Sequence, residues 1–181
     1  LATGRSRSIA LASAPTSVAV SPNGLLAAVG HDAAVSLVDL GSVPTVKRFP
    51  VNTMVGAVVL DASRRIFAFD GGNPTWMPVH WVDTAVGIDK SSSARVYGNS
   101  YPVLHPAGDR IYLAERGVSP GDIARVSLDA SGVSAVADSP YHGEYEMCGQ
   151  VWTGSAGARL YTACGNIFSA SNDASLDMRY A

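Results

Sequence analysis

Apolar residues along the chain come in short runs that are paired around polar or Pro/Gly-containing turns. Four segments share this order of apolar run, turn and second apolar run: TSVAVSPNGLLAAVG, GAVVLDASRRIFAFD, YPVLHPAGDRIYLAE and GQVWTGSAGARLYTA. Apolar and polar residues that alternate with a period of two indicate a half-buried strand. Each segment is therefore predicted to form a β-hairpin.

The four hairpins recur at a nearly constant interval. The residues just before the turns are Ser21, Asp61, His105 and Thr153, at intervals of 40, 44 and 48 residues. One blade of a β-propeller, a four-stranded antiparallel sheet, has about 40–50 residues. A third alternating run follows the hairpins, as at 34–40, and then a weaker fourth. A β-sandwich would explain the alternation, but not four copies of one turn pattern.

The intervals predict an all-β chain in which residues 1–181 form a single segment of β-propeller blades. The repeats are predicted near 14–52, 53–97, 98–138 and 139–181. Residues 1–13 are expected to be the outer strand of a preceding blade. The final DMRYA is expected to mark the start of the last blade's outer strand, so the chain resembles a piece of something larger.

Two of the turns resemble a known repeat. SVAVSPNGLLAAV and YPVLHPAGDRIYLA, with Pro-Asn-Gly at 22–24 and Pro-Ala-Gly at 106–108, are similar to the SPDG turn of bacterial β-propeller repeat proteins of the YVTN-type and lactonase-like kinds. DASRR and TGSAGAR keep the hairpin but lack the proline. The resemblance implies about four degenerate blades, and it specifies no activity, because propellers include binding modules, scaffolds and unrelated enzymes.

The resemblance also implies that the ring is incomplete, since such propellers usually close with about six to eight blades. The first interpretation is therefore a fragment of a larger propeller. A four-bladed ring closed by its own two ends is one alternative. A second chain that completes the ring is another.

The two cysteines, Cys148 and Cys164, lie symmetrically about the turn of the last hairpin. Positions paired across an antiparallel hairpin have a constant sum, which places the centre at Ala156. Directly opposed Cβ atoms lie about 4.5–5.5 Å apart, close to the distance that a disulfide needs. Two small buried thiols are the alternative. A lasting disulfide predicts an oxidising compartment, and hence an extracellular or cell-envelope location.

Composition limits the partners. The net charge is −2 and only 15% of residues are charged, with no basic run, so no nucleic acid is expected as a partner. No apolar run approaches the ~20 residues of a membrane-spanning helix. The four histidines are scattered one per repeat and show no metal-ligand spacing, so neither a metal nor another cofactor is predicted.

Candidate catalytic motifs have structural explanations. GVSPG at 117–121 satisfies the G-x-S-x-G pattern, but a nucleophile elbow requires a strand that leads into a helix, and Pro120 follows Ser119. HDAAV at 31–35 is predicted to be a turn. His105 precedes a proline turn, where it is expected to hydrogen-bond the turn backbone. No catalytic residue is predicted.

Two regions are longer than the minimal repeat, and such loops are where function concentrates. One is DGGNPTWMPVHW at 70–81, and the other is SPYHGEYEMCG at 139–149. Aromatic residues in polar loops suit stacking on a carbohydrate or docking of a protein segment. The candidate ligand-binding residues are Trp76, His80, Tyr141, His142, Glu144 and Tyr145. Trp81 and Trp152 lie in strand patterns and are expected to pack between blades.

The leading functional hypothesis is a non-enzymatic, secreted or cell-envelope propeller segment that binds a carbohydrate or protein ligand through its loops. One alternative is part of a lactonase-like enzyme whose acid and base surround the central channel. A purely structural module of a surface adhesin is the other. Carboxylates converging with a histidine would favour the enzyme, an aromatic platform the binder, and a featureless face the scaffold.

Overall fold

The computed structural model describes residues 6–181, and all regular elements in this range are β-strands. The strands are β1 (Ser17–Val20), β2 (Leu26–Asp39), β3 (Val46–Leu60), β4 (Arg65–Asp70), β5 (Trp76–Asp83), β6 (Asp89–Tyr97), β7 (Tyr101–Leu104), β8 (Arg110–Ala114), β9 (Ile123–Asp129), β10 (Gly132–Asp138), β11 (Val151–Thr153), β12 (Arg159–Thr162) and β13 (Ile167–Ser169). Neighbouring strands pair antiparallel throughout. The predicted all-β fold is confirmed for the described part of the chain.

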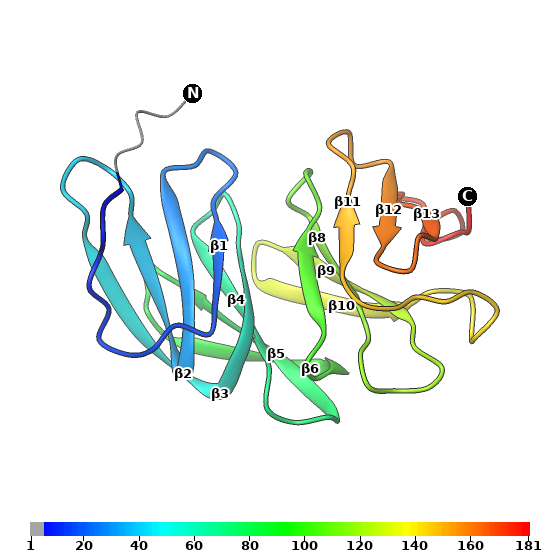
Figure 1. Cartoon of the computed structure of the whole chain (residues 1–181), viewed down its shortest axis with the longest axis horizontal. Coiled ribbons are helices and arrows are strands. Elements are labelled where there is room, and N and C mark those ends of the chain that lie inside the picture. The colour runs from blue at the N-terminus through cyan, green and yellow to red at the C-terminus, as the bar shows by residue number, and fades with distance from the viewer. Residues whose placement is uncertain (1–5) are drawn as a thin grey trace.

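Hydrogen bonds join the strands into sheets of six, four and three strands. The six-stranded sheet, β1 to β6, changes direction within β3, which pairs with β2 over 46–54 and with β4 over 55–60. The strands therefore form four layers that follow one another across the molecule (Figure 1). The first layer holds β1, β2 and the start of β3; the second holds the rest of β3 with β4 to β6; the third holds β7 to β10; and the fourth holds β11 to β13.

A pair of glycines lies where β3 changes partners. The register between β3 and β4 shifts by one residue between Val55 and Ala57. A Cβ added to Gly56 would overlap the backbone of Gly71, and one added to Gly71 would overlap the backbone of Gly56. Only glycine allows two backbones to approach this closely, so the two residues fix where the first layer passes into the second.

The middle layers are buried on both faces. In β4, Ile66 packs toward the first layer, whereas Phe67 packs toward the third. In β8, Ile111 packs toward the second layer and Tyr112 toward the fourth. A sandwich of two facing sheets would bury one face of each sheet. The successive stacking of small antiparallel sheets is instead the propeller-type arrangement predicted from the repeats.

The four hairpin turns have the same backbone structure. We call the residue just before each turn its anchor. In each turn, the residue three places after the anchor donates its amide proton to the anchor's carbonyl oxygen and has a positive φ. These residues and φ angles are Gly24 (71°), Arg64 (63°), Gly108 (74°) and Gly157 (73°). The fourth anchor is Gly154, one residue later than the predicted Thr153, because β11 continues through Thr153.

The side chains of the first three anchors hold their own turns. Ser21 Oγ, Asp61 Oδ1 and His105 Nδ1 each accept a hydrogen bond from a backbone amide of the same turn, at 2.8–3.1 Å. The role predicted for His105 is therefore confirmed. Its other ring nitrogen, Nε2, lies 2.8 Å from the carbonyl oxygen of Gly157 in the fourth layer, so the same side chain also joins two layers.

The first layer departs from the predicted repeat. Residues 31–35, expected to form a turn, and 34–40, expected to form a separate strand, lie mostly within the single long strand β2. A bulge between Asp32 and Ala34 replaces the turn. The buried ring of His31 lies 3.0 Å from Ser36 Oγ and 3.1 Å from the carbonyl oxygen of Ala14. These two partners satisfy the buried ring and allow the strand to continue through a polar segment.

No strand forms over residues 6–13, where an outer strand was expected, and residues 1–5 lie outside the described part of the chain. Instead, Ile9 and Leu11 pack on the outer face of the first layer. On the same face Val18 and Val20 are 67% and 56% exposed. At the other end of the chain, Tyr180 forms a bridge with Phe168 beside β13, which agrees with a strand beginning in DMRYA.

The two strand tryptophans differ in burial. Trp81 is 7% exposed and packs between the second and third layers, as predicted. Trp152 is 46% exposed and pairs across the strands with Tyr161, which is 42% exposed. Trp152 is therefore not covered by another layer of the described chain, because its position in β11 places it on the outer face of the last layer, and its packing between blades stays a prediction.

Candidate functional site

A cavity of about 450 Å³ lies between two loops of the third and fourth layers. One wall comes from residues 115–121, which connect β8 to β9 and include the GVSPG segment. The other comes from residues 143–149, which belong to the second predicted loop and lead into β11. The lining residues are Glu115, Arg116, Gly117, Val118, Pro120, Gly121, Gly143, Tyr145, Glu146, Met147, Cys148 and Gly149.

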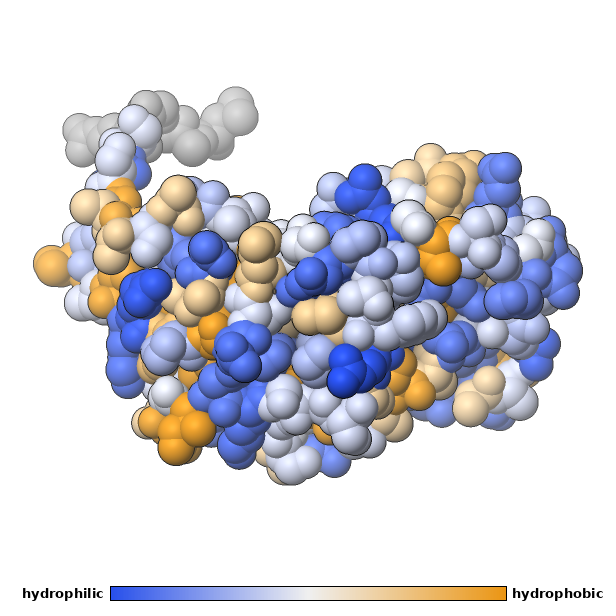
Figure 2. All heavy atoms as spheres, turned by 90° about the horizontal axis from the view of Figure 1, so that it is seen from below, coloured by the Kyte–Doolittle hydropathy of each residue, from blue (hydrophilic) through white to orange (hydrophobic). Residues whose placement is uncertain are grey.

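The direction of the strands explains why these loops meet. β8 begins at the tight turn that follows His105, so the end of β8 lies on the side of the sheet opposite to that turn. β11 runs toward the tight turn at Gly154, so the start of β11 also lies on the side away from the turns. The two loops therefore both lie below the tight turns that follow β7 and β11, which point upward (Figure 1). Viewed from this side, hydrophilic and apolar residues are interspersed (Figure 2).

Glu115 is the buried acidic residue of the first wall. Glu115 is 6% exposed, and its Oε1 has no hydrogen-bond partner. Burial raises the pKa of Glu115 to about 7, and the negative charges of Asp138 and Asp122 add to the effect. The neighbouring Asp122, in contrast, accepts hydrogen bonds from the Ile123 amide and the Ser139 hydroxyl. Oε1 of Glu115 is thus enclosed by the protein without a hydrogen-bond partner.

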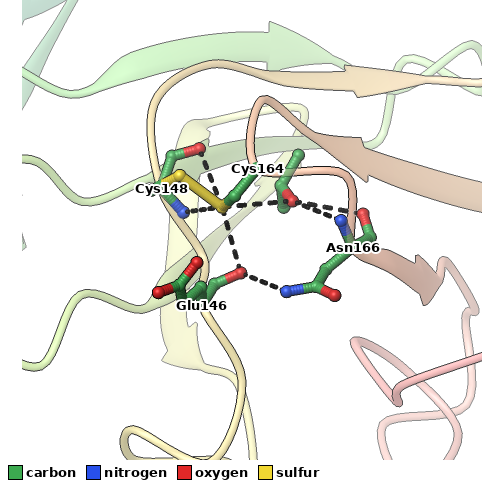
Figure 3. The surroundings of a disulfide bond; sticks show 5 residues. Glu146, Cys148, Cys164 and Asn166 are labelled. Atoms are coloured by element: carbon green, nitrogen blue, oxygen red, sulfur yellow. Dashed lines mark hydrogen bonds between the residues drawn. A yellow bond between two sulfur atoms is a disulfide. The ribbon is translucent and has the colours of Figure 1, made fainter.

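A disulfide holds the second wall of the cavity. The predicted bond between Cys148 and Cys164 is present, with the two Cα atoms 5.7 Å apart. It joins the loop before β11 to the turn between β12 and β13 (Figure 3). In the same place Asn166 Nδ2 donates a hydrogen bond of 2.8 Å to the carbonyl oxygen of Glu146. Two independent contacts therefore fix residues 146–148.

The hairpin register differs slightly from the prediction. Trp152 lies opposite Tyr161, so the centre of the hairpin falls between Ala156 and Gly157 rather than at Ala156. The cysteines consequently lie just beyond the paired strands and are not directly opposed. The disulfide therefore fixes the cavity loop rather than clamping the two strands along their length.

The tyrosines predicted as ligand-binding residues belong mainly to the core. Tyr145 stacks on Tyr180 at 4.0 Å between ring centroids and meets Tyr141 edge to face at 4.7 Å. Both rings pack around Phe168 in the cluster between the third and fourth layers. Tyr145 also lines the cavity, whereas Tyr141 does not.

The other two residues of this loop lie on its exposed tip. His142 and Glu144 are exposed, and the backbone amide of His142 donates a hydrogen bond to the Glu144 carboxylate. This bond lowers the pKa of Glu144. Neither side chain lines the cavity.

The first predicted loop lies elsewhere. Trp76 is 44% exposed and meets Tyr97 edge to face at 5.6 Å. His80 is buried, and its Nδ1 lies 3.0 Å from both carboxylate oxygens of Asp89. Neither Trp76 nor His80 lines the cavity, so the structure does not bring the six predicted residues together.

Sequence reasoning missed Glu115 and Arg116. The available signal was a carboxylate that directly ends the apolar run IYLA, where a strand leaves the core. Arg116 follows it, and its guanidinium lies over the ring of Tyr101, 4.4 Å from the centroid. Ser119 does not line the cavity, so the GVSPG segment contributes apolar side chains and backbone there rather than a nucleophile.

No helix in residues 6–181 has the length and apolarity to cross a membrane. The sequence matches no protein-family model, and no curated protein matches it. Solved structures do resemble the fold. Hydrazine synthase from Kuenenia stuttgartiensis has a TM-score of 0.59 and 16% identity, with 90% of this chain and 57% of that chain covered.

Two further structures are similar at the same level. A protein from Bacteroides fragilis described as a candidate 6-phosphogluconolactonase has a TM-score of 0.60 and 14% identity, covering 91% of this chain and 52% of its own. The tricorn protease has a TM-score of 0.59 and 13% identity, covering 94% of this chain and 18% of its own. The chain spans little more than half the length of the first two structures. At these identities the likeness shows the fold alone, which is that of propeller-type proteins.

Proposed function

We propose that the chain is a non-enzymatic segment of a β-propeller that binds a carbohydrate or protein ligand in the cavity between residues 115–121 and 143–149. The observation that carries the proposal is the cavity of about 450 Å³ between two loops of different layers, lined largely by apolar side chains and glycine backbone. A concave, mostly apolar pocket with few polar groups is typical of ligand sites.

The lining favours binding over catalysis. No serine or histidine is among the described residues that line the cavity, and its cysteine is held in the disulfide. A nucleophile paired with a base is therefore not available there. The alternative is a lactonase-like enzyme, and the observation that favours it is the pKa of Glu115 near neutrality, which suits a general acid or base.

The surroundings of the site complete the proposal. The four layers correspond to blades of a larger ring, completed by further blades or by a second chain, and the chain's coverage of about half of two similar structures supports this. The disulfide supports a secreted or cell-envelope location, because such bonds persist in oxidising compartments.

Mapping of ligand contacts by NMR tests the proposal. Uniformly ¹⁵N-labelled protein is titrated with a panel of oligosaccharides and capped peptides, and amide shifts are followed. Binding that shifts amides of residues 115–121 and 143–149 supports the site. Shifts confined to the region of Trp76 and His80 would contradict it, and chemical turnover of a bound compound would favour the enzyme.

A further inference from the structure

We propose that two copies of this chain associate head to tail, so that the outer face of the first layer of each copy packs against the outer face of the last layer of the other. The two faces lie at opposite ends of the row of layers (Figure 1). The inference rests on the proposed function, because it names the partner that completes the ring. Three features carry it: an aliphatic free face, an aromatic free face, and the way in which layers pack inside the chain.

The outer face of the first layer is aliphatic. Val18, Val20 and Val46 lie directly opposite buried residues of the cluster on which Ile9 and Leu11 pack, so their side chains share one face of the sheet. These three valines are nevertheless 67%, 56% and 40% exposed. Exposed apolar side chains that adjoin one another commonly mark an interaction surface.

The outer face of the last layer carries two aromatic rings. Trp152 of β11, Tyr161 of β12 and Ile167 of β13 lie side by side in one row across the three strands. Leu160 and Phe168, which alternate with them, pack toward the third layer. The row therefore faces away from the other layers of the described chain. Exposed tryptophan and tyrosine side chains are the anchors that protein interfaces use most often.

The contacts between layers inside the chain have a direction. Between the first and second layers, the buried aromatic ring is Phe49 of the earlier layer, and the later layer supplies aliphatic side chains. Between the second and third layers, Phe67, Phe69 and Trp81 again belong to the earlier layer, and the later one is aliphatic. The third contact has rings from both layers. The free faces follow the direction of the first two contacts, because the last layer offers the rings and the first layer the aliphatic side chains.

A second copy supplies a suitable number of layers. This chain covers little more than half of two similar structures, and propellers typically have about four to eight blades, so two copies with eight layers lie within that range. A contact between two different faces forms a closed ring only when the rotation returns to the first copy. In a ring of two copies, each copy uses both of its free faces. Pairing of like faces would leave one apolar face of each copy exposed.

Sedimentation equilibrium of the unmodified protein tests the association at concentrations from about 1 to 100 μM. We expect the mass to rise from the chain mass of 18.7 kDa to twice that value and no further, because the closed ring leaves no free face. A monomer at all concentrations would overturn the inference and leave further blades as the cover of these faces. A mass that continues to grow with concentration would also overturn it, since it indicates an open chain of copies.

One charge on either face should prevent association. Val20→Glu and Trp152→Glu each bury an unpaired carboxylate in both contacts of the ring, and we expect each to weaken association by roughly 100-fold or more. The matched controls are Val86→Glu and Trp76→Glu, whose parent residues lie in the second layer and are 61% and 44% exposed. Both controls should associate like the unmodified protein, and circular dichroism verifies that all four variants are folded. Association unchanged in Val20→Glu or in Trp152→Glu would contradict the proposed contact.

A mixture of the two variants distinguishes head-to-tail association from pairing of like faces. In the mixture, the intact aromatic face of Val20→Glu can bind the intact aliphatic face of Trp152→Glu, which restores one contact of the two. We expect particles of two copies that form roughly tenfold or more weakly than those of the unmodified protein. A mixture that stays monomeric would overturn the inference. The ligand titration reports on residues 115–121 and 143–149, so a monomer that binds a ligand there leaves the proposed function standing.

Discussion

Glu115 has lost its contact with water without gaining a hydrogen-bond partner for Oε1. Its pKa of about 7 stands above the ordinary 4.5, so the folded protein binds more protons than the unfolded chain between these values. Stability therefore falls as the pH rises through this window, and the loss is complete above the folded pKa.

We expect Glu115→Gln to remove this pH dependence. Relative to the unmodified protein, the free energy of unfolding of the variant should rise by up to about 3 kcal/mol between pH 4.5 and pH 8. Urea unfolding at four pH values in this range measures the difference. Glu146→Gln is the control, and its curve should run parallel to that of the unmodified protein. A constant difference between Glu115→Gln and the unmodified protein would show that Glu115 titrates normally.

Arg64 occupies a turn position that glycine holds in the three sister turns. Its φ of 63° is strained for a residue with a Cβ. We expect Arg64→Gly to be neutral or to stabilise the protein by up to about 1 kcal/mol, whereas Gly24→Ala should destabilise it by about 1 kcal/mol. An added Cβ at Gly24 meets no atom within 4 Å, so only the backbone conformation changes. Thermal unfolding measures both, and a Gly24→Ala variant as stable as the parent would refute the strain.

The sequence predicted the structural roles of some residues but not the burial of others. The turn role of His105 and the pairing of Cys148 with Cys164 depend on neighbours within one hairpin, and both predictions are confirmed. Glu115 was missed because its burial is a property of the folded sheet, in which Asp138, from a strand later in the chain, lies close enough to raise its pKa. The exposure of Trp152 likewise depends on what covers the last layer, which alternation along β11 does not specify.

At the level of elements, the third and fourth layers are joined by a buried polar network. The Tyr112 hydroxyl accepts a hydrogen bond from Arg110 Nε at 2.8 Å and donates one to Asp177 Oδ1 at 2.7 Å. Arg125 also contacts Asp177, at 2.8 Å. Burial and the bond to Asp177 raise the pKa of Tyr112, so its hydroxyl keeps its proton. The network orients the last layer, and with it one wall of the cavity.

Tyr112→Phe should weaken this junction. Removal of the hydroxyl leaves Arg110 and Asp177 each without one buried partner, and we expect a loss of about 1–3 kcal/mol in the free energy of unfolding. Tyr161→Phe is the matched control, because Tyr161 is 42% exposed and its change should cost less than about 0.5 kcal/mol. Chemical unfolding compares the two. Equal stability of both variants would mean that the network contributes nothing.

The disulfide should stabilise the last layer and its loop. Its cysteines are 16 positions apart, and the chain-entropy relation gives about 3 kcal/mol for a loop of this size. For a chain of 181 residues, we expect the double variant Cys148→Ser, Cys164→Ser to melt about 6–12 °C lower. Adding a reductant should lower the melting temperature of the unmodified protein but not of the variant. An unchanged melting temperature in both experiments would contradict the prediction.

Strands that pair locally could be predicted from the sequence, whereas a strand that depends on distant contacts could not. The hairpins were predictable because each strand pairs with its nearest neighbour across a short turn. The continuity of β2 was not, because HDAAV has the composition of a turn. The strand structure of this segment depends on the two hydrogen-bond partners of the buried His31. They are Ser36, nearby in the chain, and Ala14, earlier in the chain.

At the scale of the whole molecule, the two end layers each expose a face that no other layer of the described chain covers. Val18 and Val20 lie on one, and Trp152 and Tyr161 on the other. Whether further blades or a second chain cover them remains a prediction. Ring closure depends on contacts between distant layers, which neither the alternation nor the turn pattern encodes.

Fluorescence quenching tests the exposure of the last layer. In variants that keep a single tryptophan, the others replaced by phenylalanine, acrylamide should quench Trp152 and Trp76 efficiently and Trp81 weakly. Their exposed fractions are 46%, 44% and 7%. Protection of Trp152 that increases with protein concentration would show that a second copy covers this face. Protection at all concentrations would contradict the placement of Trp152.

The passage of β3 from the first layer into the second has a consequence for how such a chain could evolve. Repeat proteins commonly gain and lose units by recombination in the connections between them, and the segment 139–149 is a connection of that kind. Between the first two layers there is none, because one strand serves both and the close approach of Gly56 and Gly71 fixes their junction. We therefore expect these two layers to be inherited, duplicated or lost together, so that the pair is the modular unit at this end of the chain.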